Sequence, residues 1–229
     1  MEFGGIQKMT LLDYPGLVAC TVFTAGCNLR CPFCHNASLV ISPQSSIPQE
    51  EVLSYLQKRK GVLDGVVVSG GEPLLHKALP SFLEQVKALG LRVKLDTNGT
   101  NPQMLKALVE AGLVDKVAMD IKNGPSHYAK TTGIADLDLK PIEQAKEYLL
   151  QNPVEYEFRT TVVRGLHTEQ TLEEAAAWIR GAKAYFLQQF VDHGDLIAPD
   201  ALGAFTPEQM AGFLHTVKRH VPAAQCRGI

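Results

Sequence analysis

The stretch Cys27-Asn28-Leu29-Arg30-Cys31-Pro32-Phe33-Cys34-His35-Asn36 carries three of the chain's five cysteines, separated by three residues and then by two. Three thiolates on so short a loop can bind three irons of a cubane 4Fe–4S cluster and leave the fourth iron without a protein ligand. Clusters that only carry electrons are held by four cysteines. The spacing therefore predicts that Cys27, Cys31 and Cys34 bind a cluster whose last iron takes its ligand from elsewhere.

Two other uses of these cysteines stay open at this point. A structural zinc site takes four nitrogen or sulfur ligands, usually in Cys-x2–4-Cys pairs, and His35 could be the fourth ligand on paper. His35 directly follows Cys34, however, and adjacent ligands close such a site poorly. Disulfides fit less well, because five cysteines with three on one loop suit a metal site in a reducing compartment.

Composition limits the classes of function that the chain can have. At 229 residues and 45% hydrophobic content, residues 1–229 are expected to form one well-buried domain. The net charge of −2 gives no electrostatic argument for a nucleic acid or membrane partner. The first residues lack the basic and apolar segments of a signal peptide, and no run of about eighteen apolar residues occurs. We therefore expect a cytoplasmic protein that binds neither nucleic acid nor membrane.

Short β-branched runs alternate with amphipathic stretches, a pattern typical of βα units and a parallel sheet. Strands are expected at 17–24, 65–69, 92–96, 116–121, 155–163 and 184–190, and helices near 48–60, 75–89, 102–111, 141–150, 168–182 and 206–220. A closed eight-stranded barrel takes around 250 residues, so six units predict an α/β fold with an incomplete (β/α)6 TIM-like barrel of parallel strands. An open doubly wound sheet remains the alternative, and either fold places ligands at the carboxyl ends of the strands.

The ends of the chain and its two remaining cysteines complete this expectation. Residues 1–16 should lead into the first strand, 17–40 should hold that strand and the cysteine loop, and 206–229 should form the last helix and the tail. Cys20 lies in an apolar run and is expected to be a buried core thiol. Cys226 is near the C-terminus and is expected to be a surface thiol.

A second feature follows the cysteines by about forty residues. The apolar run Val66-Val67-Val68 ends in Ser69-Gly70-Gly71-Glu72-Pro73. The two glycines permit positive φ and allow a ligand to approach the backbone closely. Taken alone, this segment is equally well an ordinary turn from a strand to a helix.

Together, the cysteine spacing, Phe33 just before the third cysteine, and the Gly-Gly-Glu-Pro segment resemble the radical S-adenosylmethionine (SAM) superfamily. The resemblance implies that the amino and carboxylate groups of SAM bind the last iron of the cluster. It also implies that Gly70, Gly71 and Glu72 contact the amino group of SAM, and that Phe33 and His35 lie in the cofactor site.

Further strand ends resemble those of the activating enzymes of glycyl radical enzymes, above all the branch that activates anaerobic ribonucleoside-triphosphate reductase. They are Lys94-Leu95-Asp96-Thr97-Asn98-Gly99 and Val117-Ala118-Met119-Asp120-Ile121-Lys122. The resemblance implies a monovalent cation held by Asp96, Thr97, the Met119 carbonyl and Asp120, beside the SAM carboxylate. Hard oxygen ligands suit such a cation, but the same acids could simply cap the ends of their strands.

Three more positions follow from the same resemblance. Lys122 is expected near the SAM carboxylate or ribose, and Arg159, in an apolar strand, near SAM or a partner. Where the related activating enzyme of pyruvate formate-lyase carries a histidine that reaches SAM, this chain reads Leu187-Gln188-Gln189-Phe190, with His193 slightly too late. Gln188 or Gln189 is expected to take that role.

The resemblance implies a function and two kinds of partner. The chain is expected to cleave SAM reductively to a 5′-deoxyadenosyl radical and to generate a glycyl radical on a partner enzyme, anaerobic ribonucleotide reductase above all. A low-potential flavodoxin or ferredoxin would supply the electron. Two alternatives remain, which are a radical SAM enzyme acting on a small metabolite and a non-catalytic Fe–S module that binds SAM.

Overall fold

One sheet organises the part of the chain that the computed structural model describes, residues 1–41, 46–192 and 194–228. The strand order in this sheet is β3-β1-β2-β4-β5-β6-β7-β8-β9. The strands are β1 (Glu2–Thr10), β2 (Ala19–Thr24), β3 (Ile47–Pro48), β4 (Gly65–Gly70), β5 (Arg92–Thr97), β6 (Lys116–Asp120), β7 (Glu155–Val162), β8 (Tyr185–Gln189) and β9 (Gln225–Arg227). From β2 to β9 neighbouring strands are parallel, whereas β1 and β3 add to the sheet in antiparallel fashion.

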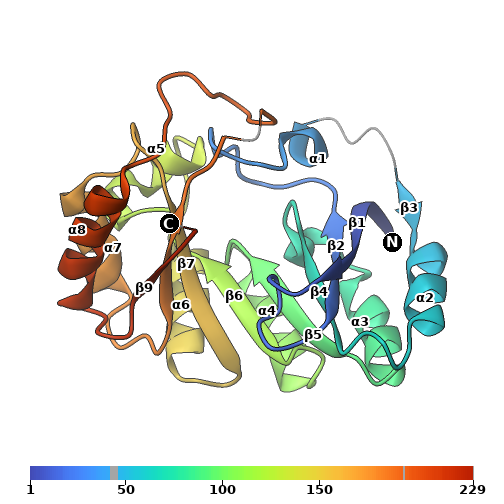
Figure 1. The fold of residues 1–229 in the computed structure, drawn as a ribbon. Helices are drawn as coiled ribbons and strands as arrows, with labels where there is room; N and C mark the ends of the chain where they lie inside the picture. Colours follow the sequence, from blue (N-terminus) through green and yellow to red (C-terminus); the bar gives the residue numbers. More distant parts are fainter. Residues whose placement is uncertain (42–45, 193, 229) are drawn as a thin grey trace.

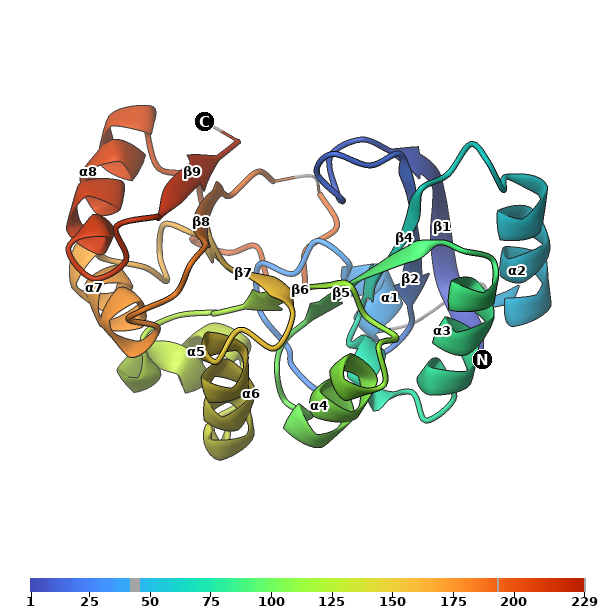
Figure 2. The ribbon, with the colours of Figure 1, turned by 90° about the horizontal axis from the view of Figure 1, so that it is seen from below.

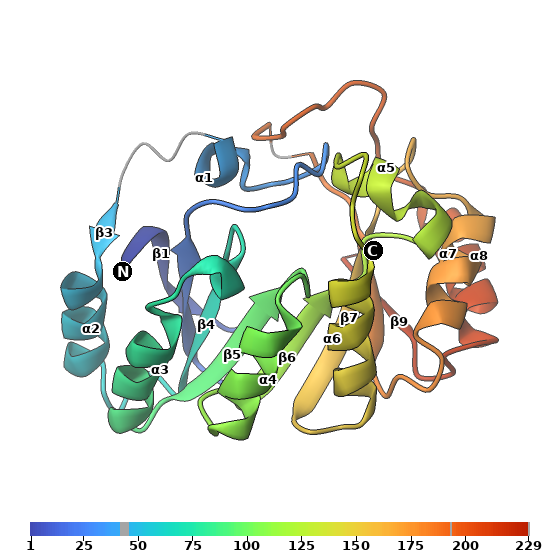
Figure 3. The ribbon, with the colours of Figure 1, turned by 180° about the vertical axis from the view of Figure 1, so that it is seen from behind.

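Helices cover the outer face of this curved sheet and leave one side open (Figures 2 and 3). The covering helices are α2 (Gln49–Lys58), α3 (Leu79–Ala88), α4 (Pro102–Glu110), α6 (Lys140–Leu150), α7 (Glu169–Trp178) and α8 (Pro207–Lys218). The short helices α1 (Ala37–Ile41) and α5 (Tyr128–Thr132) lie at the top of the barrel in Figure 3. Several begin at caps that the sequence supplies, because Asn101, Thr168 and Thr206 each accept a hydrogen bond from the first turn of their helix. The result is an incomplete parallel barrel, and Figure 1 looks into its open side between β1 and β9.

The six predicted strands are confirmed as β2, β4, β5, β6, β7 and β8, but the two ends of the sheet were not predicted. Residues 1–16 are more than a lead-in, since they contain β1, which pairs with β2. β1 includes Gly4 and Gly5 and shows no clean alternation of buried and exposed residues, so periodicity could not reveal it. β9 has three residues, too few for any pattern.

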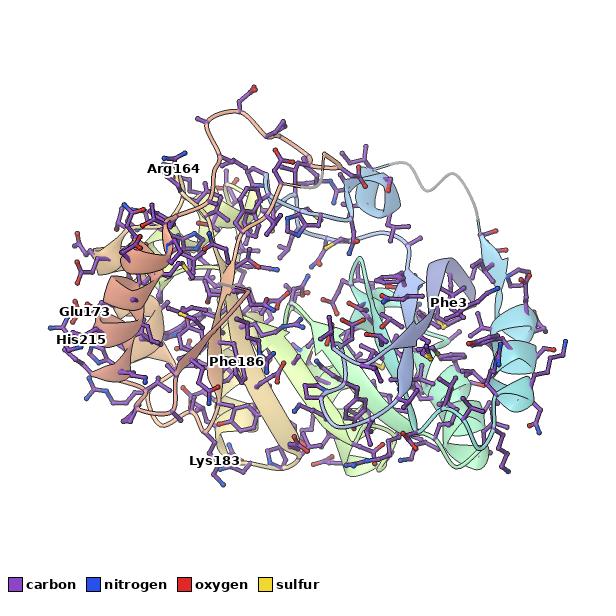
Figure 4. The ribbon with its side chains drawn as sticks, viewed as in Figure 1. Phe3, Arg164, Glu173, Lys183, Phe186 and His215 are labelled. Atoms are coloured by element: carbon purple, nitrogen blue, oxygen red, sulfur yellow. The ribbon has the colours of Figure 1, made fainter. Side chains whose placement is uncertain are left out.

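The core lies between the sheet and the helices. Outward-facing strand residues such as Val66, Leu95 and Val117 are fully buried there. Phe3 on β1 packs against Phe82 of α3 with ring centroids 4.8 Å apart, and Figure 4 shows Phe3 at one edge of the sheet and Phe186 near the other. Cys20 is fully buried as expected.

Cys226 differs from the expectation of a surface thiol. It is half-buried in β9 and packs against the core, because β9 extends the sheet beside β8. Cys226 is therefore part of the sheet because β9 pairs with β8, a pairing that could not be predicted from the sequence.

The amino ends of the strands are closed by the loop between β1 and β2. Lys94 Nζ donates to the Asp13 carbonyl oxygen at 2.6 Å, and Thr21 Oγ1 donates to Asp13 Oδ2 at 2.6 Å. Tyr14 is buried against Ala19 and Val67. This floor loop, residues 11–18, closes one end of the barrel. Among the described residues, no helix combines the length and apolarity that crossing a membrane requires.

Candidate active site

A cavity of about 250 Å³ lies at the carboxyl ends of the strands. One wall is the cysteine loop, residues 25–36, which follows β2 and lies at the top of Figure 1. The other wall consists of the ends of β4 to β8. The lining residues that matter for the chemistry are Cys27, Cys31, Cys34, Asp96, Asn98, Asp120, Lys122, Arg159 and Gln188. The sequence-predicted positions from five strand ends therefore meet the cysteines in one place.

The cysteine loop is held by main-chain hydrogen bonds and by apolar packing. Gly26 N donates to the Leu39 carbonyl at 2.8 Å, and Arg30 N donates to the Thr132 carbonyl at 2.9 Å. Leu29 and Phe33 are buried in a small apolar cluster with Phe190, on whose ring His35 stacks at 5.5 Å between centroids. These contacts hold the loop against α1, α5 and the end of β8.

The three thiols face the cavity without converging on one point. Burial raises the pKa of Cys31 to about 11 and also raises the pKa of Cys27. Within the described residues, no three His, Cys, Asp or Glu side chains are close enough together to hold a single metal ion. The zinc interpretation would require Cys27, Cys31, Cys34 and His35 to share one ion. A cubane cluster is different, because each thiolate binds a separate iron.

The Gly-Gly-Glu-Pro segment packs directly against the end of β2. Gly70 has φ +111°, and a Cβ there would lie 2.4 Å from Thr24 N, while a Cβ on Gly71 would lie 1.8 Å from the Gly26 carbonyl oxygen. Gly71 N donates to the Thr24 carbonyl at 2.8 Å, and Asn36 Nδ2 donates to the Gly70 carbonyl at 3.0 Å. Both glycines line the cavity, but their lack of a side chain is required by the cysteine loop itself.

Glu72 differs from its predicted role as a SAM contact. Its side chain is fully buried and is absent from the cavity lining in the described part of the chain. It accepts hydrogen bonds from Leu74 N at 3.0 Å, Thr97 Oγ1 at 2.8 Å and Asn98 N at 2.6 Å. Burial raises its pKa to about 7, although these hydrogen bonds act in the opposite direction. Glu72 therefore fastens the end of β5 to the turn after β4.

Two acids and two bases form the far wall of the cavity. Arg159 lies between the acids: its Nε donates to Asp120 Oδ1 at 3.0 Å and its Nη1 to Asp96 Oδ2 at 3.2 Å. Lys122 Nζ donates to Asp120 Oδ2 at 2.9 Å. Burial raises the pKa of Asp120, but the charges of Arg159 and Lys122 outweigh it and lower that pKa to about 2. Asp120, Lys122 and Arg159 are therefore charged at neutral pH.

This arrangement does not fit the predicted monovalent cation. The guanidinium of Arg159 already bridges the carboxylates of Asp96 and Asp120, where the cation was expected. Thr97 Oγ1 donates to Glu72 Oε1 at 2.8 Å. The role of the Met119 carbonyl oxygen stays a prediction.

Strand alternation decides between the two glutamines. Gln188 lines the cavity, whereas Gln189 Nε2 donates to the Phe205 carbonyl at 2.7 Å on the other face of β8. Gln188 therefore keeps the predicted place, and Gln189 does not. His193 lies outside the described residues.

Several lining residues were not predicted from the sequence. Ser69 Oγ donates to Asp96 Oδ2 at 3.1 Å, and Thr161 on β7 faces the cavity two residues after Arg159. Asn98 also lines the cavity and its amide reaches Cys27 Sγ at 3.7 Å. Asn98 lay within a motif that the sequence singled out, and its position directly after the β5 end was the available signal.

The family model of the radical SAM superfamily matches residues 21–179, more than half of the chain. The chain belongs to this superfamily. A protein of Methanocaldococcus jannaschii named as a glycyl-radical enzyme activating enzyme is 32% identical over 194 residues, 81% of this chain and 78% of that protein. The pyruvate formate-lyase-activating enzyme of Clostridium pasteurianum is 34% identical over 124 residues, and the match spans only 51% of its length.

Solved structures show the same fold. A domain of the pyruvate-formate lyase-activating enzyme from Bacteroides vulgatus aligns with a TM-score of 0.58 at 19% identity, covering 72% of this chain and 99% of that one. SuiB of Streptococcus suis, bound to S-adenosylmethionine, aligns with a TM-score of 0.69 at 12% identity over 89% of this chain and 48% of that one. At such identities the likeness shows the fold alone.

As a radical SAM enzyme, the chain uses a 4Fe–4S cluster and SAM. The cavity fits this pair of cofactors in its donor chemistry. One wall of the cavity offers three thiols that can bind iron. The other wall offers two positively charged side chains, Lys122 and Arg159, that can bind the carboxylate of SAM. Asp96 Oδ1 is buried without a hydrogen-bond partner among the described residues, and it lies 3.7 Å from the ammonium nitrogen of Lys94.

Proposed function

We propose that the chain activates a glycyl radical enzyme, with anaerobic ribonucleotide reductase as the first partner to test. The observation that carries the proposal is one cavity lined both by the three thiols and by Asp96, Asp120, Lys122 and Arg159. In addition, 81% of this chain matches the Methanocaldococcus jannaschii protein named as a glycyl-radical enzyme activating enzyme. The open side of the barrel supports a polypeptide substrate, because the described sheet runs from β3 at one end to β9 at the other without closing.

In this proposal the two walls of the cavity have separate tasks. Cys27, Cys31 and Cys34 bind iron, and the main chain at Gly70 and Gly71 receives the amino group of SAM. Lys122 and Arg159 neutralise the SAM carboxylate, since both stay protonated beside Asp120. When bound, the cluster and SAM supply a 5′-deoxyadenosyl radical by reductive cleavage. Phe33, His35 and Gln188 complete the cofactor pocket from the remaining sides.

Two finer points belong to the same proposal. The electron comes from a low-potential flavodoxin or ferredoxin, because SAM cleavage needs a strongly reducing donor. The working compartment is the cytoplasm, which the free state of the chain's five cysteines supports.

Anaerobic reconstitution followed by a labelling assay tests the proposal. The wild-type chain should hold about four irons and should produce 5′-deoxyadenosine from SAM and a reductant. A partner enzyme labelled with deuterium at the glycine Cα should transfer deuterium into 5′-deoxyadenosine and gain a glycyl radical. A partner variant with alanine at that glycine is the matched control and should transfer none.

Cysteine variants assign the ligands within the same assay. Cys27→Ala, Cys31→Ala and Cys34→Ala should each abolish SAM cleavage, whereas Cys20→Ala and Cys226→Ala should retain it, because their thiols lie in the core and in β9. Full activity in any of the first three variants would overturn the ligand assignment. Deuterium arriving from a small metabolite, with no radical on any partner protein, would instead favour a small-molecule enzyme.

A further inference from the structure

Asn98 connects the end of β5 to the first cysteine of the loop. Its Nδ2 donates to Cys27 Sγ at 3.7 Å and to Asn28 Oδ1 at 3.0 Å. The main-chain N–H of Leu29 donates to the same sulfur at 3.4 Å. Within the part of the chain that the structure describes, no N–H group makes such a bond to the sulfur of Cys31 or Cys34. The three thiols are therefore unequal, and Cys27 alone has two N–H donors.

The orientation of the Asn98 amide is determined by its neighbours. Thr100 donates to Asn98 Oδ1 twice, from its main-chain N–H at 3.0 Å and from Oγ1 at 2.7 Å. Asn28 Nδ2 in turn donates to Thr100 Oγ1 at 2.9 Å, which closes a ring of three side chains. Turning the amide over would place its NH2 group against the Thr100 N–H, with donor facing donor. The amino group of Asn98 must therefore face the sulfur.

The main chain of Asn98 is fixed as firmly as its side chain. Its N–H donates to Glu72 Oε2 at 2.6 Å, and Glu72 also accepts from Thr97 Oγ1. Asn98 is buried, at 5% exposure, yet it lines the cavity. A donor held in this way by the turn after β4 keeps its place when the cavity is filled.

We propose that Asn98 is a positioning residue that tunes the cluster by donating a hydrogen bond to the Cys27 thiolate. The proposal rests on the proposed function, because it requires Cys27 to bind iron. Adding one electron to a cluster increases the negative charge on its thiolates, and an N–H donor stabilises that charge more in the reduced state than in the oxidised state. The Asn98 amide therefore raises the reduction potential and makes the cluster easier to reduce.

The test is a redox titration of the reconstituted protein without SAM, followed by electron paramagnetic resonance. Asn98→Leu has a similar volume and no donor. Losing one such hydrogen bond should disfavour the one-electron reduction about five- to tenfold, a shift of about 40–60 mV toward negative potential. Thr100→Val keeps the Asn98 donor and removes only its orienting hydroxyl, so it should shift the potential by less than half as much.

Each outcome decides the proposal. An unchanged potential in a fully loaded Asn98→Leu variant overturns it, and so does an equal shift in Thr100→Val, which would indicate general disturbance of the loop. Asn98→Ser, whose side chain is too short to reach the sulfur, replaces the leucine variant if that variant does not load iron. A wild-type chain that binds no cluster would instead refute the proposed function, which this measurement separates from the role of Asn98.

Discussion

Two groups of charged side chains face the inside of the barrel, one above the other. The cavity group is Asp96, Asp120, Lys122 and Arg159, and the floor group is Lys94, Lys116, Glu157 and Arg227. They share strands, since Lys94 and Asp96 both belong to β5, and Glu157 and Arg159 both belong to β7. Side chains two residues apart on a strand point the same way, so one inward face supplies both groups.

The two groups differ in how completely they are covered and paired. In the floor group, the side chains of Lys94 and Glu157 are 3% and 2% exposed. Glu157 accepts from Arg227 at 2.9 and 3.1 Å, and the floor loop lies across this end. In the cavity group the acids are less covered, since the side chains of Asp96 and Asp120 are 15% and 27% exposed. Asp96 Oδ1 has no hydrogen-bond partner among the described residues, although Lys94 Nζ of the floor group lies 3.7 Å from it. The two groups therefore differ in the cover and the hydrogen bonding of their acids, although Arg227 in the floor group is itself 32% exposed.

Removing the central acid of the floor group should have the largest effect on stability. Glu157→Ala removes the carboxylate that Arg227 contacts twice and leaves Lys94 with the more distant Asp96 Oδ1, at 3.7 Å. We expect the free energy of unfolding to fall by about 3 kcal/mol, the lower end of the range for breaking a buried ion pair. Glu155→Ala is the matched control, because Glu155 is 59% exposed in its pair with Lys116 and should cost less than about 1 kcal/mol. Urea unfolding of both variants checks this, and equal losses would remove the distinction between the groups.

The two buried glutamates should respond to pH in opposite directions. Burial raises the pKa of Glu157, but Arg227 and Lys94 outweigh it and lower that pKa to about 2, whereas Glu72, without a cationic partner, has its pKa raised to about 7. The contribution of Glu157 to stability is therefore present above pH about 4.5 and lost as the pH falls toward 2. The contribution of Glu72 is present below pH about 4.5 and lost as the pH rises through 7, up to roughly 3 kcal/mol.

The free energy of unfolding measured between pH 5 and 8 reports the contribution of Glu72 separately from that of Glu157. The wild-type chain should lose stability across this range, and Glu72→Gln should remove much of that slope. Glu157→Gln should keep the wild-type slope, because Glu157 titrates below the range. An unchanged slope in Glu72→Gln would show that its three hydrogen bonds keep Glu72 ionised despite its burial.

Two lysines that each pair with a carboxylate, one in each group, allow the contributions of the two groups to SAM binding to be compared. Lys122 lies 2.9 Å from Asp120 in the cavity group, and Lys116 lies 2.7 Å from Glu155 in the floor group. Lys122→Met should weaken SAM binding about ten- to hundredfold, since a charge-assisted contact to the SAM carboxylate is lost. Lys116→Met should change the affinity less than about twofold. Calorimetry on the reconstituted proteins compares them, and equal affinities would exclude Lys122 from the SAM site.

The smallest expected effect concerns monovalent cations. Because Arg159 bridges Asp96 and Asp120, the rate of SAM cleavage should agree within about twofold in potassium, sodium and a bulky organic cation at equal ionic strength. Asp96→Asn, which removes one carboxylate charge, should not create a cation requirement. A strong preference for potassium would show that Arg159 moves aside when SAM binds, and would restore the cation site that the sequence predicted.

Much of the fold and the placement of the site followed from patterns that act over a few residues. The six parallel strands were predictable from their β-branched runs. Because ligands bind at the carboxyl ends of such strands, the sequence also predicted that the cysteine loop and Asp120 lie at the same edge of the sheet, as the structure shows. β1 and β9 were not predicted from the sequence. β1 contains two adjacent glycines, and β9 is only three residues long. Their pairing depends on strands that are distant in the sequence.

What the sequence determined by itself is the donor chemistry: three thiols at a fixed spacing, and acids and bases at the ends of successive strands. Only the tertiary structure decided which of these groups meet. It turned Glu72 into the interior, chose Gln188 over Gln189, and placed Arg159 between Asp96 and Asp120. The physical reason is that local spacing fixes which residues a chain offers, whereas the direction and charge of each side chain depend on the strands packed beside it.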